Sequence, residues 1–298
     1  MSDTTVMESY GAQSMVAPLA RVVMSRPGKA MAEADPAVWH YAGPLDAETL
    51  ESQHSALVSL VRDAGSEILW LEEGLDGLAD AVFTHDPSLM TDKGAVLLRM
   101  GKPKRRGEES AHAQLYAEHD IPILGTIEAP GTVEAGDCLW FDAETLVVGR
   151  GFRTNQSGIE QLASTLAPLG VRVEAFDLPV QLGEAACLHL MSLISLLDED
   201  LALVHSPLLP VALYQTMKAR GMTLVEAPAD EFAASETLSI NVLALAPRYG
   251  VMIDGLPKTA EALRRAGCEI VTFPGDHLCI KAEGGPTCLT RPVLRTAR

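Results

Sequence analysis

A recurring order of short apolar segments runs through the 298 residues of the chain. Hydrophobic patterning predicts strands at 20–25, 67–71, 94–100, 146–149, 171–176, 224–227, 236–246, 249–253 and 269–272, a strand-turn-strand pair within 191–204, and helices at 46–64, 108–118, 158–169, 208–220 and 257–266. The unit strand, strand, helix, strand recurs about five times, although no residue pattern repeats with it. Small sheets set radially, with their helices outside, would bring the strand-end loops around a central channel.

A doubly wound parallel sheet is the alternative that this element order leaves open. Its usual dinucleotide site needs a G-x-G-x-x-G turn, and the chain has none. A Walker loop, a G-x-S-x-G turn and an H-E-x-x-H helix are also missing. Residues 1–18 are rich in Ser and Thr and aperiodic, so we expect a flexible tail there and one catalytic α/β domain over 19–298.

The charge and the apolar pattern exclude several classes of protein. A net charge of −17, with 40 acidic against 23 basic residues, is opposite to that of a surface that binds DNA or RNA. Asp3 and Glu8 distinguish the N-terminus from a signal peptide. No window approaches the roughly 18 apolar residues of a membrane-spanning helix. These patterns predict a cytoplasmic protein without nucleic-acid or membrane partners.

Two polar stretches are candidates for binding elements. Residues 26–45 are rich in Pro and Gly, which predicts a long loop of the kind that often serves as a lid. Asp80, His85 and Asp86 bracket the strand-like pair 82–83. On an extended chain Asp80 and Asp86 would face the same side. The alternative is a strand end with solvated aspartates.

Cys288 differs from the other cysteines because it follows a Gly284-Gly285 turn close to the C-terminus. We expect the two glycines to adopt backbone angles closed to other residues, after a last short strand at 277–281, and to present the thiol to a pocket. A lone cysteine is more often a small buried hydrophobe, so Cys288 needs a base and a pocket nearby. No C-x-x-C pair predicts a zinc site or a disulfide framework among the other four, which are Cys138, Cys187, Cys268 and Cys279.

Further candidates are a histidine and two arginines. His189 lies on an apolar run, where a satisfied core histidine is the common outcome. Arg105 belongs to a basic loop and could bind a carboxylate with two parallel hydrogen bonds, although such loops are often only solvated turns. Arg153 lies at a predicted strand-to-helix junction, where side chains often point into a pocket.

Six short motifs, taken in order, resemble dimethylarginine dimethylaminohydrolase. They are F-T-H-D-P, K-R-R-G-E, I-E-A-P-G-T-V-E-A-G-D, F-R-T-N, L-H-L and G-G-P-T-C, and the resemblance runs from about residue 20 to residue 293. That family belongs to the guanidino-group-modifying superfamily, together with arginine deiminases and amidinotransferases. The resemblance implies a pentein fold, which is a five-bladed α/β-propeller of ββαβ units with pseudo-fivefold symmetry. It implies no metal or organic cofactor, and it is compatible with a homodimer.

The resemblance also implies a role for each candidate residue. Cys288 would be the nucleophile, His189 the general acid and base, and Asp86 the carboxylate that binds the guanidinium. The substrate-binding set would consist of Asp80, His85, Arg105, Arg153 and Glu283, with the two arginines on the amino-acid end of the substrate.

Position 85 departs from the related families. His85 stands where dimethylarginine hydrolases carry Glu and arginine deiminases carry Arg. Because a neutral imidazole gives one negative charge fewer against a guanidinium, we expect a substrate other than dimethylarginine, unless His85 points away. Glu283 replaces the usual Asp and could compensate. Met191 stands where deiminases carry an acidic residue.

Together these residues predict a cysteine hydrolase that acts on a C–N bond of a linear amidine. The Cys288 thiolate would attack the guanidino carbon of a substituted arginine or related compound, form a thiouronium intermediate, and release an amine or ammonia and a ureido product such as citrulline. Two alternatives remain: an amidinotransferase or arginine deiminase on the same scaffold, and a non-catalytic propeller-fold protein that binds a partner.

Overall fold

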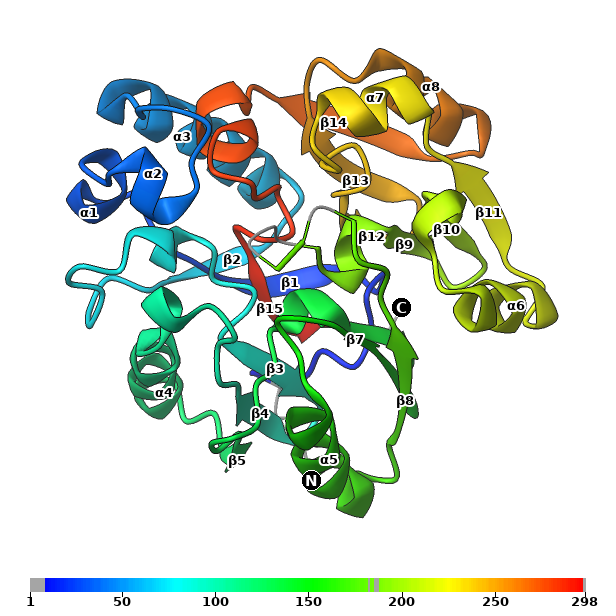
Figure 1. Cartoon of the computed structure of the whole chain (residues 1–298), viewed down its shortest axis with the longest axis horizontal. Helices are drawn as coiled ribbons and strands as arrows, with labels where there is room; N and C mark the ends of the chain where they lie inside the picture. Colours follow the sequence, from blue (N-terminus) through cyan, green and yellow to red (C-terminus); the bar gives the residue numbers. More distant parts are fainter. Residues whose placement is uncertain (1–8, 182, 185–187, 297–298) are drawn as a thin grey trace, which may run out of the picture.

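The structure, a computed structural model, describes residues 9–181, 183–184 and 188–296. Five three-stranded sheets surround a central axis, and the long helices lie at the periphery (Figure 1). In every sheet the middle strand pairs antiparallel with one neighbour and parallel with the other. The expected five-bladed α/β-propeller is therefore confirmed.

Each blade has the order strand, strand, helix, strand. The first blade consists of β15 (Arg291–Arg295), β1 (Leu19–Met24), α3 (Ala47–Asp63) and β2 (Glu67–Trp70). The second consists of β3 (Ser88–Thr91), β4 (Gly94–Leu97), α4 (Glu108–Glu118) and β5 (Ile123–Thr126), and the third of β6 (Cys138–Asp142), β7 (Thr145–Arg150), α5 (Gln156–Leu166) and β8 (Arg172–Asp177). The fourth consists of β9 (Ile194–Asp198), β10 (Leu201–Val204), α6 (Val211–Ala219) and β11 (Thr223–Glu226), and the fifth of β12 (Leu243–Ala246), β13 (Tyr249–Ile253), α8 (Pro257–Arg265) and β14 (Glu269–Phe273). Three shorter helices, α1 (Lys29–Ala32), α2 (Pro36–Trp39) and α7 (Ala229–Ala234), lie in connections.

The first blade closes the ring, because one edge strand of its sheet comes from the other end of the chain. Strand β15 pairs with β1. Gly11 extends this closure, since its N–H donates to Val293 O and its carbonyl accepts from Arg295 N, both at 2.8 Å. Ala12 and Val16 are buried. The expectation of a flexible tail over 1–18 is therefore wrong for residues 9–18, which the β15 edge holds in place.

The helices form where capping and apolar spacing agree. In α3 the Asp46 side chain accepts a hydrogen bond from Thr49 N at 2.8 Å, and Leu50, Leu57 and Val61 are buried on one face. All five helices expected from the apolar pattern are present within a few residues of the predicted bounds. No helix in the described ranges is long and apolar enough to cross a membrane.

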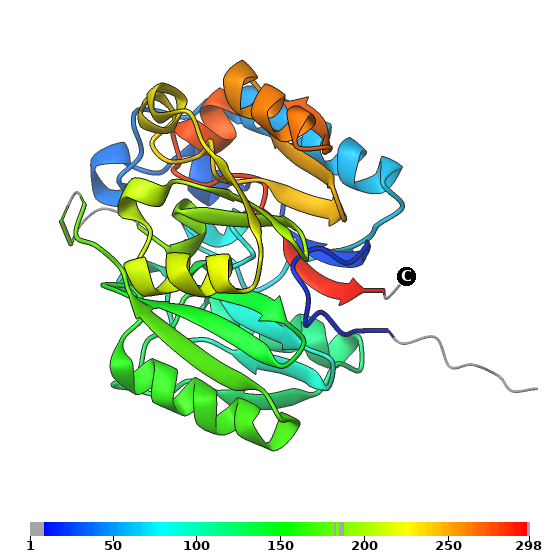
Figure 2. The ribbon, with the colours of Figure 1, turned by 90° about the vertical axis from the view of Figure 1, so that its right-hand side faces the viewer.

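The connections differ most from the prediction. The strand-like pair 82–83 lies at the end of a 3₁₀ helix, Ala79–Val82, so the extended-chain argument for Asp80 and Asp86 does not apply. The segment 277–281 is not a strand but largely a π-helix, Asp276–Ile280. Residues 26–45 contain α1 and α2. In the side view, α1 and α2 lie on one face of the ring and the C-terminal end lies on the other (Figure 2).

Candidate active site

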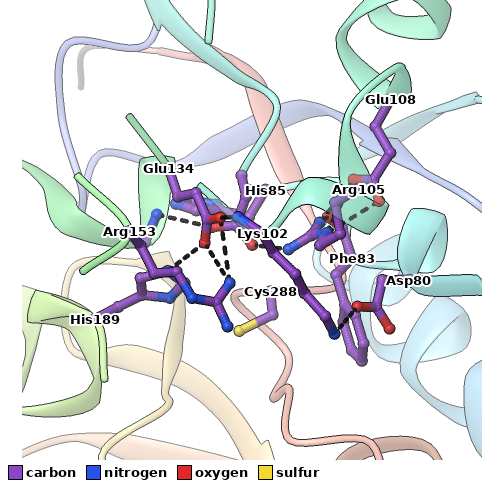
Figure 3. A network of polar contacts seen from close by, with 12 residues as sticks. Asp80, Phe83, His85, Lys102, Arg105, Glu108, Glu134, Arg153, His189 and Cys288 are labelled. Atoms are coloured by element: carbon purple, nitrogen blue, oxygen red, sulfur yellow. Dashed lines mark hydrogen bonds and ion pairs between the residues drawn. The ribbon is translucent and has the colours of Figure 1, made fainter. Parts of the chain in front are cut away.

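Two cavities meet at Cys288. The smaller has a volume of about 40 Å³ and is lined mainly by charged side chains. The larger has a volume of about 910 Å³ and is lined mainly by apolar ones. Cys288, His189 and Glu283 line both. Figure 3 shows the sulfur of Cys288 beside Arg153 and His189, in a network of charged groups. A reacting carbon beside this sulfur would lie between the two cavities.

The five blades contribute to this site in the same way, because each first strand is preceded by a polar residue of the network. These residues are Asp86 before β3, Glu134 before β6, His189 before β9, Asn241 before β12 and Cys288 before β15. The propeller brings the starts of these strands together, so residues about 50 positions apart in the chain become neighbours.

The Gly-Gly turn positions Cys288, but not for the expected reason. Neither Gly284 nor Gly285 has a positive φ; the left-handed residue is Glu283, with φ of 60°. The glycines are needed because other groups approach them closely. A Cβ at Gly284 would lie 2.3 Å from Phe83 Cε1, and one at Gly285 would lie 2.4 Å from Asn241 Cγ. The missing side chains let the turn pack against both residues.

Asn241 holds the thiol and had no role in the sequence analysis. Its Nδ2 donates to Cys288 Sγ at 3.2 Å, and its Oδ1 accepts from Thr287 N at 2.9 Å. The backbone donor fixes the orientation of the amide, so that the NH₂ group faces the sulfur. Burial, and next the charge of Asp86, raise the pKa of Cys288 to about 11, while His189 and Asn241 act in the opposite direction. The resting group is a neutral thiol at pH 7.

His189 is held by Glu134, a second residue that the sequence analysis missed. The His189 Nε2 donates to Glu134 Oε2 at 2.7 Å, and both residues are buried. Glu134 also accepts from Arg153 Nη1 at 3.1 Å and from the backbone N of Lys102 at 2.9 Å. Burial alone would raise the pKa of Glu134, but the His189 hydrogen bond and the Arg153 charge lower it to about 2. A carboxylate thus orients the imidazole and stabilises its protonated form.

Asp86 is buried between a glycine N–H and an arginine. Its Oδ1 accepts from Gly136 N at 2.8 Å, and its Oδ2 accepts from Arg105 Nη1 at 2.7 Å. Burial acts to raise the pKa of Asp86, but Arg105, and then His189, lower it well below its usual value. Gly136 cannot carry a side chain, because a Cβ there would lie 2.5 Å from His189 Nδ1 and 3.0 Å from Asp86 Oδ1.

Arg105 lines the small cavity, but its guanidinium is hydrogen-bonded to protein groups. Its Nε and Nη2 donate to the two oxygens of Glu108 at 3.0 and 2.8 Å, Nη2 also donates to Phe83 O at 2.9 Å, and Nη1 donates to Asp86. The side chain is buried. The expected contact with the amino-acid end of a substrate is therefore not supported; the geometry indicates that Arg105 positions Asp86.

The remaining expected binding residues line the small cavity. Asp80 accepts from Tyr41 OH at 2.7 Å and pairs with Lys102 Nζ at 2.5 Å. Lys102 Nζ also donates to Trp39 O at 3.2 Å, so the segment 26–45 reaches the site as expected of a binding loop. Arg153 is paired with Glu134, as described above.

His85 points away from both cavities. Its Nδ1 donates to Thr290 O at 3.0 Å, and its side chain lines a separate internal cavity of about 20 Å³ with Thr287 and Arg295. Burial lowers the pKa of His85 to about 3, so the imidazole is neutral. The structure supports the alternative that this position does not contact the guanidinium.

Asp86, Glu134 and His189 are also the only cluster in the described ranges whose ligand atoms lie close enough to hold a metal ion, within 4.8 Å of one another. Both carboxylates already accept from an arginine, at 2.7 Å for Asp86 and 3.1 Å for Glu134. A divalent cation would compete with these two positive charges, whereas a planar guanidinium needs only lone pairs directed at its edges. The expectation that no metal is needed stays a prediction.

The other cysteines differ from Cys288 in access. Cys138, Cys268 and Cys279 are buried, and none of them lines either cavity. Burial raises the pKa of Cys279 well above that of an ordinary thiol. Cys187 lies outside the described residues.

Comparisons with known proteins identify relatives of this chain. The arginine deiminase family model matches residues 72–213 and 205–295. The chain is 31% identical over 238 residues to N(G),N(G)-dimethylarginine dimethylaminohydrolase of Streptomyces coelicolor, covering 80% of this chain and 83% of that protein. It is 26% identical over 251 residues to the protein of the same name from Pseudomonas aeruginosa, covering 84% and 91%.

Solved structures with the same fold are similar over nearly the whole chain. A cysteine-to-serine variant of the Pseudomonas aeruginosa enzyme in complex with citrulline superposes with a TM-score of 0.73 at 22% identity, covering 92% of this chain and 99% of that one. An amidinotransferase of the saxitoxin pathway from Microseira wollei gives a TM-score of 0.81 at 17% identity, covering 97% and 98%. The resemblance found in the sequence motifs is thus confirmed, and the chain belongs to the arginine deiminase family.

Proposed function

We propose that the protein is a hydrolase that cleaves a C–N bond of a guanidino compound, with Cys288 as the nucleophile. The observation that carries this proposal is the convergence of a thiol, a His–Glu pair and a buried carboxylate on one cavity from separate blades. The relatives named dimethylarginine dimethylaminohydrolase and arginine deiminase support it. A substituted arginine or a related guanidine is the substrate class.

The small cavity suits a planar cation. Asp80 and Asp86 are buried carboxylates in its lining, and charge-assisted hydrogen bonds to them would fix the guanidinium plane. The Phe83 ring lines the same cavity and offers an aromatic face to the cation. Held in this way, the central carbon would lie beside Cys288 Sγ.

Substrate binding would itself prepare the nucleophile. The thiol is neutral in the empty site, because burial and the charge of Asp86 raise its pKa. A bound guanidinium places a positive charge beside the sulfur and so lowers that pKa. The thiol gives its proton to His189, the thiolate adds to the guanidino carbon, and the pair of electrons of the C=N bond moves to nitrogen.

His189 would carry the protons. It gives a proton to the departing amine as the C–N bond breaks, and Glu134 stabilises its charged form beforehand. The remaining thiouronium group is then attacked by a water that gives its proton to His189. The C–S bond breaks, which releases a ureido product and restores the thiol.

The test is a mass-spectrometric screen of guanidino compounds with the wild-type protein, Cys288→Ser and Cys268→Ser. We expect ureido products from the wild type and from Cys268→Ser, because Cys268 lines neither cavity. The Cys288→Ser variant should be inactive. Equal turnover by Cys288→Ser would contradict the thiol mechanism.

The same screen separates the alternatives by their second product. An amine or ammonia released with the ureido product indicates hydrolysis, whereas transfer of the amidino group to an added amine indicates an amidinotransferase. No product from any guanidine would favour the non-catalytic alternative. The cytoplasmic location and the homodimer remain predictions.

A further inference from the structure

The positive charges of the small cavity are all paired with carboxylates of the protein. Arg105 is paired with Glu108 and Asp86, Arg153 with Glu134, and Lys102 with Asp80. These pairs are largely buried. A substrate carboxylate would therefore have to share a cation with a buried carboxylate of the protein, and the charge of that carboxylate would oppose its binding.

The small cavity also lacks room for an amino-acid head group. Its volume of about 40 Å³ fits a planar group of a few atoms but not the additional ammonium and carboxylate of an amino acid. The larger cavity of about 910 Å³ shares Cys288, His189 and Glu283 with the small one and offers space for the rest of the substrate.

The larger cavity offers no Lys or Arg side chain to a substrate carboxylate among its described lining residues. Its lining includes Phe152, Leu208, Leu238 and the ring of Phe232, which stacks on His205 at 3.6 Å between centroids. Such a lining favours an apolar arm, since burying a carboxylate there without a cationic partner is costly.

The only acidic residues in the described lining of this cavity are Glu236 and Glu283, and both have left-handed backbones, with φ of 49° and 60°. Non-glycine residues adopt this region at an energetic cost, which is often found at functional sites. Burial, and then the charge of Glu236, raise the pKa of Glu283, so the two carboxylates influence each other. A cationic end of an arm would relieve this repulsion.

We propose that the preferred substrate is a guanidine whose apolar arm carries no carboxylate and ends in a neutral or cationic group. The proposal rests on the guanidine hydrolase function proposed above and narrows its substrate class. It assigns the 910 Å³ cavity to the arm and the small cavity to the guanidinium alone.

Arginine and agmatine form a matched pair for the test, because they differ only in the carboxylate. We expect kcat/KM for agmatine to exceed that for arginine by roughly tenfold or more. Phenethylguanidine, with a neutral apolar arm, should also be turned over faster than arginine. All three reactions should be lost in Cys288→Ser.

A positive charge placed in the larger cavity should reduce this preference. Phe152 is 49% exposed, so Phe152→Arg can be accommodated at the wall without burying a charge. We expect this variant to raise the ratio of kcat/KM for arginine to that for agmatine several-fold. The control Phe152→Leu should leave the ratio unchanged, because it keeps the wall apolar.

The outcomes distinguish this proposal from the function on which it rests. Faster Cys288-dependent turnover of arginine than of agmatine would overturn the substrate class and leave the hydrolase function standing. An unchanged ratio in Phe152→Arg would overturn the assignment of the arm to this cavity. Absence of turnover with every guanidine would overturn the hydrolase function itself.

Discussion

At the scale of single residues, the thiol of Cys288 depends on the amide of Asn241, which is the one side chain that donates to its sulfur among the described contacts. Asn241→Asp keeps the shape, removes the donor and adds a negative charge. We expect the pKa of Cys288 to rise further above 11 and kcat to fall by about ten- to a thousandfold, as for loss of a donor to a developing anion.

The thiolate absorbance of the wild type and Asn241→Asp, each compared with its Cys288→Ser form, measures this pKa. Asn241→Ala serves as the neutral comparison, and its pKa should lie between the two. An unaltered titration in both variants would mean that Asn241 only fills space.

Gly136 gives a second prediction, based on packing. Because a Cβ would lie 2.5 Å from His189 Nδ1, Gly136→Ala must displace the imidazole or Asp86. A misplacement of about 1 Å can cost about a hundredfold in rate. We expect kcat/KM to fall by that order while the fold remains, as judged by circular dichroism. Gly28→Ala is the matched control, because nothing lies within 4 Å of its added Cβ.

Residue types in the sequence located the site but did not reveal its contacts. Cys288, His189 and Asp86 line one cavity as expected, although their roles remain predictions. Glu134 was part of a quoted motif and Asn241 of an expected strand, yet their partners are distant in the chain and visible only in space. The alternatives for His85 and Arg105 stayed open because the sequence does not show in which direction a side chain points.

At the scale of elements, the start of α4 supports Asp86 through a buried chain of charges. Glu108 in its first turn holds Arg105, and Arg105 holds Asp86. Burial raises the pKa of Glu108 to about 7, so at pH 8 the carboxyl is mostly ionised and Glu108→Gln leaves Arg105 short of one buried negative charge. We expect a loss of about 3 kcal/mol in the free energy of unfolding and reduced activity, because breaking a buried pair on one side is costly.

Urea unfolding of Glu108→Gln and Glu118→Gln tests this prediction within one helix. Glu118 is exposed at the other end of α4, so its variant should change stability by less than about 0.5 kcal/mol. Similar midpoints for the two variants would show that the Arg105–Glu108 pair adds little to stability.

The apolar pattern predicted the long helices and most of the strands correctly, and it failed for several short elements. The helices α3, α4, α5, α6 and α8 and the longer strands matched the pattern. Strands β3, β5 and β15 were missed, since four or five residues carry little periodic signal. The π-helix at Asp276–Ile280 was interpreted as a strand because its apolar residues fit either structure.

At the scale of the whole molecule, acid should destabilise the protein through its buried histidines. Burial lowers the pKa of His54 to about 4 and that of His85 and His112 to about 3. In the unfolded chain each titrates near its ordinary value of about 6.5. Below that pH the unfolded state binds more protons, so stability is complete above about pH 6.5 and is lost as the pH falls toward 4.

Each histidine should contribute a loss of about 2 kcal/mol between pH 6.5 and pH 5. Asp137 and Glu108 act in the opposite direction, because burial raises their pKa to about 6 and about 7, and their protonation favours the folded state. We therefore expect a net loss of about 2 kcal/mol, measured as a fall in the urea midpoint from pH 7 to pH 5. His54→Leu should retain more of its stability over this interval than the wild type does. An equal fall in the two proteins would show that His54 is not a source of the acid sensitivity.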